Sequence, residues 1–307
     1  MHPRISLVAL AVLGTGCAAK TAPKESVPVE PGEASSEAAE AVTESVETQA
    51  PAAVTSHTLA ADVAWNPAFP DREVSPEMAL VAGNPKEGAF TFMVRFPAGH
   101  KEDIHSHPAD FTGIVTSGVV NHGRSADEFD SLSEGSVFVQ PAEEVHYTAC
   151  ANDEPCSFVG HLSGPMVMNP AEAPEEGEMQ YKVIDAEGVG YEAINPQQPQ
   201  GPKMAVLVGD RTAGAFQALV NLPAGASGPM HYHSSTYSAV LLMGAVEKAD
   251  GTRLPAGSYW TTAGGESHIT SCVSESACVF YAVMDGAFDM VPVAAPESAE
   301  DAAPAQE

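Results

Sequence analysis

Positive charge is scarce in this 307-residue chain, which has 13 Lys and Arg against 41 Asp and Glu. The formal net charge of −28 would repel nucleic acid and anionic lipid surfaces, because both carry the same sign. Long helical periodicity is also scarce, and 26 Gly and 25 Pro lie among short apolar runs. The sequence therefore argues against a polyanionic partner, nucleic acid included, and predicts short strands joined by turns.

The N-terminus has an apolar run, Ile5–Leu13, that is too short to span a bilayer. It leads into Leu13-Gly14-Thr15-Gly16-Cys17, which resembles the lipobox of bacterial lipoproteins, although Gly14 stands where Leu is usual. The resemblance implies that residues 1–17 are a lipoprotein signal peptide and that Cys17 is lipidated. A plain secretory signal with a chance cysteine is the alternative. We expect a cell-envelope protein, on the periplasmic or cell-surface side, whose only membrane contact is the lipid anchor.

The segments that flank the fold are built from only a few residue types. Residues 18–56 are mostly Ala, Glu, Ser, Thr, Val and Pro, without a repeating apolar face. Such a segment cannot bury enough surface to offset its ordering entropy, so it predicts a disordered linker. Residues 293–307 similarly predict a disordered acidic tail. We expect two folded domains between them, at 57–170 and 171–292.

An internal repeat dominates the folded part. Gly88-Ala89-Phe90 matches Gly214-Ala215-Phe216 at an offset of 126 residues. From Gly135 onwards the offset is 122, because the first copy has four extra residues between Gly118 and Gly135. A length change confined to one loop indicates duplication of a packed domain. Short runs separated by turn residues predict an all-β sandwich or barrel for each copy.

Each copy carries three histidines at matching positions. His105 and His107 would share one face of a strand, and His146 follows a separate strand. The second copy repeats this pattern with His231, His233 and His268. Three converging neutral imidazoles suit a first-row divalent metal and leave positions open for water or substrate. We therefore predict two metal sites; six barrel histidines that bind no metal are the alternative.

The spacing of these residues resembles the two motifs of the cupin superfamily. The first copy fits both motifs through Gly99, His105, His107, Gly118, Gly135, Pro141 and His146. The second copy fits them too, with Ala263 where Pro is usual. The resemblance covers nearly all of 76–290 and implies a bicupin, an all-β chain with two tandem jelly-roll barrels. The chain is also similar to a bacterial bicupin family of unknown function, and its barrels to the cupin-like domain of zinc anti-sigma factors.

The glutamate of the first cupin motif, a fourth ligand in many cupins, is replaced by Phe111 and Tyr237. Each site is therefore expected to be a three-His site, and the resemblance implies iron, zinc, manganese, copper or nickel. Strand alternation should turn Asp110 to the opposite face. Tyr237 is a candidate proton donor, with a core aromatic role as the alternative. His122, like His57, His100 and His161, has no histidine partner in the repeat and is interpreted as a surface or core residue.

Four of the five cysteines form two Cys-x5-Cys pairs at equivalent positions, Cys150/Cys156 and Cys272/Cys278. Each pair brackets a polar turn, and opposed residues across a hairpin lie close enough for a disulfide. Export would supply the oxidising compartment. We predict two cross-hairpin disulfides. Metal ligation or redox chemistry at Cys150 and Cys272 is the alternative, but it leaves the other two cysteines unexplained.

Two functions of different classes stay open, because the cupin fold does not fix a reaction. The three-His sites favour a metal-dependent, dioxygenase-like enzyme that acts on a small organic substrate. The lack of an acid or base at matching places in both copies favours a non-catalytic lipoprotein that binds a small ligand or metal. A structural role for the metals comes third. A small-molecule ligand or substrate is the expected partner, and the sequence allows a homo-oligomer.

Overall fold

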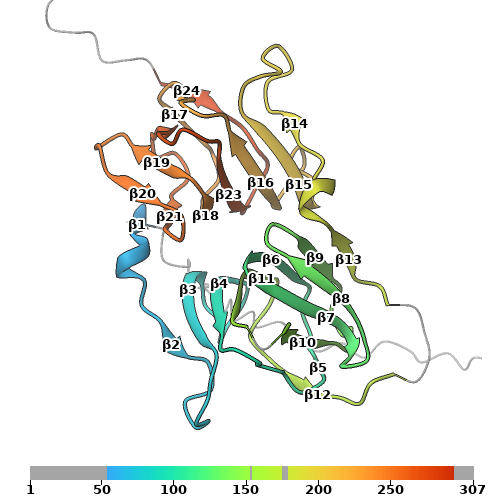
Figure 1. Cartoon of the computed structure of the whole chain (residues 1–307). Helices are drawn as coiled ribbons and strands as arrows, with labels where there is room; N and C mark the ends of the chain where they lie inside the picture. The colour runs from blue at the N-terminus through green and yellow to red at the C-terminus, as the bar shows by residue number, and fades with distance from the viewer. Residues whose placement is uncertain (1–53, 153, 175–178, 294–307) are drawn as a thin grey trace, which may run out of the picture. The chain divides into compact units, whose positions relative to one another are not determined.

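The computed structural model describes residues 54–152, 154–174 and 179–293, and the structural statements below concern these residues. They form two consecutive jelly-roll units, so the predicted all-β fold is confirmed (Figure 1). The predicted signal peptide, Cys17 and nearly all of the linker and the tail lie outside the described residues. Within the described part, no helix is long and apolar enough to cross a membrane.

The first unit is built on a seven-stranded sheet with the order β13-β9-β6-β11-β4-β3-β2. A three-stranded sheet, β10-β7-β8, and the pair β12-β5 complete it. The strands are β2 (Asn66–Pro67), β3 (Glu77–Gly83), β4 (Phe90–Phe96), β5 (His105–Ser106), β6 (Phe111–Ser117), β7 (Val119–Ser125), β8 (Glu128–Ser133), β9 (Val137–Gln140), β10 (Tyr147–Cys150), β11 (Cys156–Leu162), β12 (Asn169–Pro170) and β13 (Lys182–Ile184).

The second unit repeats this arrangement with the sheet orders β1-β21-β18-β23-β16-β15-β14, β20-β19-β22 and β17-β24. Its strands are β1 (Ser56–Thr58), β14 (Glu192–Ala193), β15 (Lys203–Gly209), β16 (Phe216–Leu222), β17 (His231–Tyr232), β18 (Tyr237–Met243), β19 (Ala245–Lys248), β20 (Arg253–Pro255), β21 (Tyr259–Thr262), β22 (Thr270–Cys272), β23 (Cys278–Met284) and β24 (Val291–Pro292). Short 3-10 helices at Ala60–Asp62 and Ala186–Gly188 follow β1 and β13.

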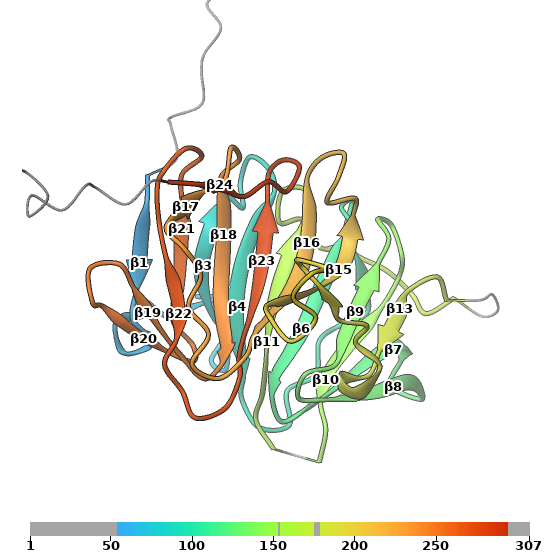
Figure 2. The same ribbon diagram turned by 90° about the horizontal axis from the view of Figure 1, so that it is seen from above.

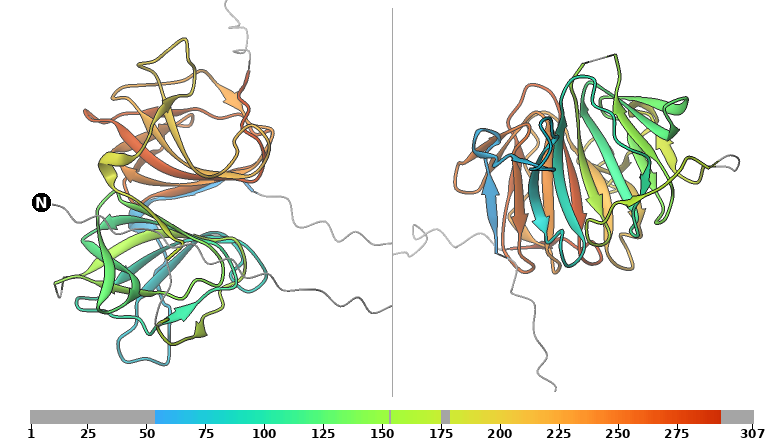
Figure 3. Two further views of the ribbon diagram at one scale, coloured as in Figure 1. Left: turned by 90° about the vertical axis from the view of Figure 1, so that its right-hand side faces the viewer. Right: turned by 90° about the horizontal axis from the view of Figure 1, so that it is seen from below.

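Each barrel takes one edge strand from the segment that precedes the other barrel. β1 comes before the first barrel in the chain but pairs antiparallel with β21 of the second, with His57 opposite Trp260. β13 comes before the second barrel but pairs with β9 of the first, with Val183 opposite Phe138. Figures 2 and 3 show the blue β1 segment beside the orange strands of the second barrel. This exchange ties the two barrels together through backbone hydrogen bonds as well as side-chain packing.

Alternation along the long strands separates the barrel interiors from the interface. In β4, Phe90, Phe92 and Val94 belong to the core of the first barrel, because side chains two residues apart share a face. Met93, on the opposite face of β4, belongs to a third cluster that includes Leu219 of the second barrel. Both faces of β4 are therefore covered, which explains why its residues are buried almost without interruption.

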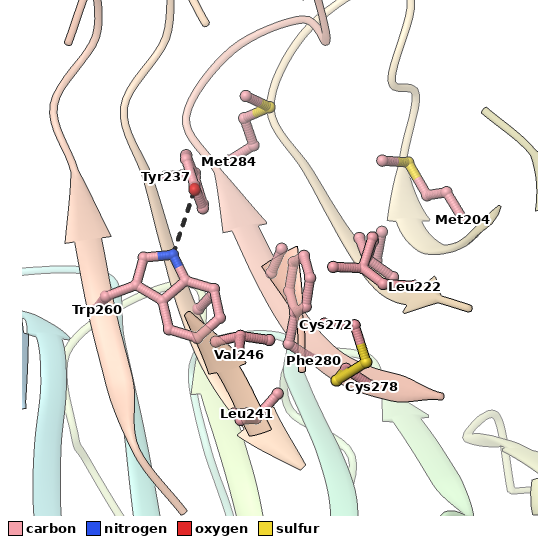
Figure 4. Close-up of a cluster of buried hydrophobic side chains, with 14 of the residues drawn as sticks. Met204, Leu222, Tyr237, Leu241, Val246, Trp260, Cys272, Cys278, Phe280 and Met284 are labelled. Atoms are coloured by element: carbon pink, nitrogen blue, oxygen red, sulfur yellow. Dashed lines mark hydrogen bonds between the residues drawn. A yellow bond between two sulfur atoms is a disulfide. The ribbon is translucent and has the colours of Figure 1, made fainter. Parts of the chain in front are cut away.

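Both predicted disulfides are present. Cys150 and Cys156 join β10 to β11 with a Cα–Cα distance of 5.5 Å, and Cys272 and Cys278 join β22 to β23 at 5.7 Å. All four cysteines are buried, and the second pair lies in the core of its barrel (Figure 4). The alternative of free thiols or metal-binding cysteines is therefore ruled out at these positions.

Candidate metal centres

The first three-His group forms where β5 meets the segment before β10. His105 pairs with His146 across an isolated antiparallel bridge, and His107 follows His105 by two residues on the same face. The three side chains can offer ligand nitrogens that all lie within 4.8 Å of one another. The Nε2 atoms of His105 and His107 are 3.3 Å apart. The structure thus brings together the first predicted triad.

Backbone carbonyls fix the orientation of these three rings. The Nδ1 of His105 is 2.7 Å from the carbonyl oxygen of Asp103, and the Nδ1 of His107 is 2.7 Å from that of Val167. The Nδ1 of His146 is 3.1 Å from the carbonyl oxygen of Glu144. An Nδ1–H that donates to a carbonyl leaves the Nε2 lone pair free, which is the tautomer that binds a metal.

The Nε2 of His146 tests whether this site fits a metal. It is fully buried and has no hydrogen-bond partner in the described part of the chain. A buried polar atom without a partner is costly, and a bound cation would satisfy it. Burial lowers the pKa of His105 to about 4 and lowers the pKa of His146 further, so both rings are neutral at pH 7. Neutral, carbonyl-anchored imidazoles fit a divalent transition metal.

The second group, His231, His233 and His268, has the same construction. Its ligand nitrogens also lie within 4.8 Å of one another, and His231 and His268 form the equivalent isolated bridge. The rings contact the carbonyl oxygens of Pro229 at 2.9 Å, of Glu266 at 3.1 Å, and of Asp289. Desolvation lowers the pKa of His268 to about 4, with smaller effects from the charges of His231, His233 and Lys248.

The residues that replace the cupin glutamate lie against these rings. Phe111 is 5.7 Å from His107 between ring centroids, and Tyr237 is 5.4 Å from His233. The hydroxyl of Tyr237 accepts a hydrogen bond of 3.2 Å from Trp260 Nε1 (Figure 4), and burial raises its pKa. Asp110 is exposed and accepts a hydrogen bond from the backbone of Ala142, outside both histidine groups.

A polar relay behind His146 was not anticipated from the sequence. His122 is fully buried, and its Nε2 is 2.9 Å from Gln140 Oε1. The amide nitrogen of Gln140 is 2.8 Å from His146 Nδ1, and His122 Nδ1 is 3.1 Å from Thr148 Oγ1. His146 Nδ1 cannot both accept from this amide and donate to the Glu144 carbonyl. In the metal-binding tautomer, with the proton on Nδ1, Gln140 couples the two imidazoles with its amide turned so that Oε1 faces His146 and the amide nitrogen faces His122. Alternation along β7, which turns His122 inwards with Val120 and away from Asn121, is the signal that could have found it.

The second barrel has different residues at the same positions. Lys248 stands four residues after Gly244, as His122 stands four after Gly118, and its Nζ is 3.2 Å from Thr270 Oγ1. The position of Gln140 is taken by Thr262, at the offset of 122. Among the described residues, His268 Nδ1 contacts only the carbonyl oxygen of Glu266. The second triad therefore lacks the relay.

The two sites also differ in exposure. His105 and His146 are 3 % and 0 % exposed, whereas His231 is only half-buried and His268 is 9 % exposed. In the first barrel Gly123 lies opposite Tyr147, so β7 continues past the level of His146. In the second barrel β19 ends at Lys248, opposite Thr270, before that level is reached. The shorter hairpin leaves the second site more open.

Comparison with known proteins agrees with the fold. Residues 57–291 match the model of a family described as Domain of unknown function (DUF4437), and no curated protein matches. A putative dioxygenase structure from Nostoc punctiforme is similar with a TM-score of 0.65 at 15 % identity, over 79 % of this chain and 87 % of that one. Lactobacillus farciminis oxalate decarboxylase is similar with a TM-score of 0.53 at 10 % identity, over 77 % of this chain and 88 % of that one. A mutant of Bacillus subtilis oxalate decarboxylase has a TM-score of 0.52 at 13 % identity, over 78 % of this chain and 80 % of that one. At these identities the likeness concerns the cupin-type fold alone.

Proposed function

We propose that this chain, which belongs to the family described as Domain of unknown function (DUF4437), holds a divalent transition metal in each barrel and acts as a dioxygenase-like enzyme on a small organic molecule. The observation that carries the proposal is the matched pair of three-His groups. In all six rings Nδ1 contacts a backbone carbonyl, which leaves Nε2 for the metal. The putative dioxygenase among the structural neighbours supports the same class of reaction.

The residues around the triads suit such chemistry. A bound metal would act as a Lewis acid that polarises the substrate. The anchored histidines would hold three nitrogens in place without reorganisation. Phe111, which meets Phe138 edge-on at 5.1 Å, gives the first site an apolar wall beside His107.

A second candidate is a non-catalytic binding protein. The observation that favours it is the deep burial of the first triad, whose three histidines are at most 5 % exposed. Such burial gives a substrate little access to the three histidines, which suits metal retention more than turnover. The resemblance of the barrels to the cupin-like domain of zinc anti-sigma factors supports the same interpretation.

Metal analysis followed by oxygen uptake separates the two candidates. The content of iron, manganese, copper, nickel and zinc is measured in protein purified without added metal or chelator. Oxygen consumption by the same protein is then measured with thiol, diketone and flavonoid substrates. Redox-active metal together with oxygen consumption supports the enzyme. Stoichiometric zinc without turnover supports the binding protein. Metal-free protein that takes up none of these ions under any loading condition would refute both.

We also propose that the chain is exported and anchored through a lipidated Cys17. The two buried disulfides support export, because such bonds persist in oxidising compartments and are rare in reducing ones. Mass spectrometry of the mature N-terminus after expression in a bacterial host tests this proposal. A diacylated cysteine at position 17 is expected, and Cys17→Ala should release the protein from the membrane fraction. An unmodified mature N-terminus elsewhere would refute the anchor.

A further inference from the structure

Lys248 places an amine inside the second barrel. It lies at the end of β19 on the same face as Val246, which is fully buried in the barrel core. Its Nζ is 3.9 Å from the centroid of the Trp260 ring and 3.2 Å from Thr270 Oγ1. Thr270 follows His268 by two residues, so the amine lies beside the metal-site histidines.

This amine has no carboxylate partner in the described part of the chain. None of the ion pairs found there includes Lys248. Asp250 is the one acidic group that favours its charged form, but it is exposed and already accepts a hydrogen bond from the backbone of Thr252. Desolvation accordingly lowers the pKa of Lys248 to about 7. A hydroxyl and an aromatic face compensate a half-buried ammonium only in part, so a negative group brought beside this amine would stabilise its charged form.

In the first barrel the position of Lys248 is not a cation, and the buried Arg124 of β7 has a carboxylate partner, Glu128, at 3.6 Å. His122 occupies the equivalent position, and burial lowers its pKa to about 4, so the ring is neutral at pH 7. Both nitrogens of His122 have partners, Gln140 and Thr148. Among the described residues, the amine without a carboxylate partner therefore lies in the barrel whose histidines are also more exposed.

We propose that the second barrel is the ligand-binding barrel and takes a small anionic ligand, a carboxylate, whose negative group pairs with the ammonium of Lys248. Pairing would relieve the desolvated charge and add a charge-assisted hydrogen bond. The identity of a ligand at the metal site rests on the proposed function, but the ion pair with Lys248 does not. Acetate is the simplest probe, and acetamide is a neutral molecule of nearly the same shape.

Tryptophan fluorescence can follow this binding directly. The chain has two tryptophans, and Trp65→Phe leaves Trp260, whose ring lies under the Lys248 amine, as the sole reporter. We expect acetate to change the emission saturably, with acetamide at least about tenfold weaker. Lys248→Met should abolish the acetate response, and Lys248→Arg should keep it. Lys182→Met removes the same charge from an exposed position in β13 and should change nothing.

The outcomes separate this inference from the proposed function. The titration is run on protein as purified and after EDTA treatment, and metal content is measured for each variant. A Lys248-dependent acetate response in either state supports the inference, even if no metal is found. Equal responses to acetate and acetamide, or an unchanged acetate response in Lys248→Met, overturn it. If Lys248→Met does not fold, Lys248→Gln replaces it, and acetate binding by that variant likewise overturns the inference.

Discussion

The two barrels share their histidine triads and disulfides but differ in the residues just behind the triads. Where the first barrel has His122, Gln140, Phe111 and Phe138, the second has Lys248, Thr262, Tyr237 and Trp260. Carbonyl anchors and the cysteine pair stand at equivalent positions in both. The difference teaches that a duplicated barrel can keep one ligand geometry while the charge and the openness of its site change.

Ligand substitution should give the largest effect and tests whether the sites are independent. His146→Ala and His268→Ala each remove one of three ligands, so each variant should lose the metal of its own barrel and keep the other. Because metal sites of this kind depend on every protein ligand, the expected loss is essentially complete. Metal content per chain measures it, and the double variant should bind none. Loss of both metals from one single variant would show that the barrels are coupled.

Acid should weaken the first barrel more than the second. Burial lowers the pKa of His122 and of His161 to about 4. The equivalent residues of the second barrel are Val283, which does not titrate, and Lys248, whose pKa of about 7 lies above most of the acid range. Because the folded pKa values of the two histidines lie below the ordinary 6.5, the unfolded chain takes up the protons first. The contribution of each neutral histidine to the free energy of unfolding is therefore fully present above about pH 6.5. It is lost as the pH drops towards 4, by up to about 3 kcal/mol for each histidine.

Hydrogen–deuterium exchange of metal-free protein at pH 7.5 and pH 5 resolves the two barrels. Faster exchange should develop first in β7, β10 and β11. His161→Val introduces the residue that the second barrel has at the equivalent position, Val283, and should reduce the difference in exchange rate between pH 7.5 and pH 5. Its buried partner Thr91 loses a 3.0 Å hydrogen bond, so the variant is compared with itself across pH. Equal acid sensitivity of both barrels would contradict the prediction.

Disulfide removal should affect the two barrels alike. Cys150→Ser with Cys156→Ser, and Cys272→Ser with Cys278→Ser, each open a loop with the same sequence separation of 6. Chain entropy then predicts a loss of about 2 kcal/mol in either case. Urea unfolding of the two double variants measures this loss, with reduction of the wild-type protein as a check. A much larger loss in one barrel would show that its hairpin has a further role in packing.

The parts of the fold that depend on local spacing could be predicted from the sequence. His105 and His107 share a face because they are two residues apart, and the cysteine pairs are close because each spans one hairpin turn. The repeat added His146 and His268 through matching offsets. These features needed no knowledge of which strands lie side by side in the barrel.

The exchange of β1 and β13 and the relay behind His146 depend instead on tertiary pairing. Nothing in Ser56–Thr58 itself indicates that this short segment pairs with Trp260, some two hundred residues later in the chain. His122 and Gln140 are interpretable only once β7, β9 and β10 are known to face one interior. Unlike His105, His122 has no histidine at the equivalent position, so a search for repeated histidines passes over it.

The relay gives the smallest expected effect and the sharpest contrast between the barrels. Gln140→Leu removes the amide between His122 and His146, so His146 Nδ1 keeps only the carbonyl of Glu144. Because that carbonyl still fixes the tautomer, we expect metal affinity at the first site to fall only about tenfold, or ~1.4 kcal/mol. The absorption bands of bound cobalt(II) should shift as well, which a purely structural role for Gln140 would not cause.

Thr262→Val is the matched control, because it removes the polar group at the same position of the barrel that has no relay. Competition with a chelator, carried out on His268→Ala protein for the first site and on His146→Ala protein for the second, isolates each affinity. The control should leave the second site unchanged, since Thr262 has no hydrogen bond to His268 among the described residues. Equal losses in both barrels would mean that the polar group matters for packing alone, and the relay would then have no part in setting metal affinity.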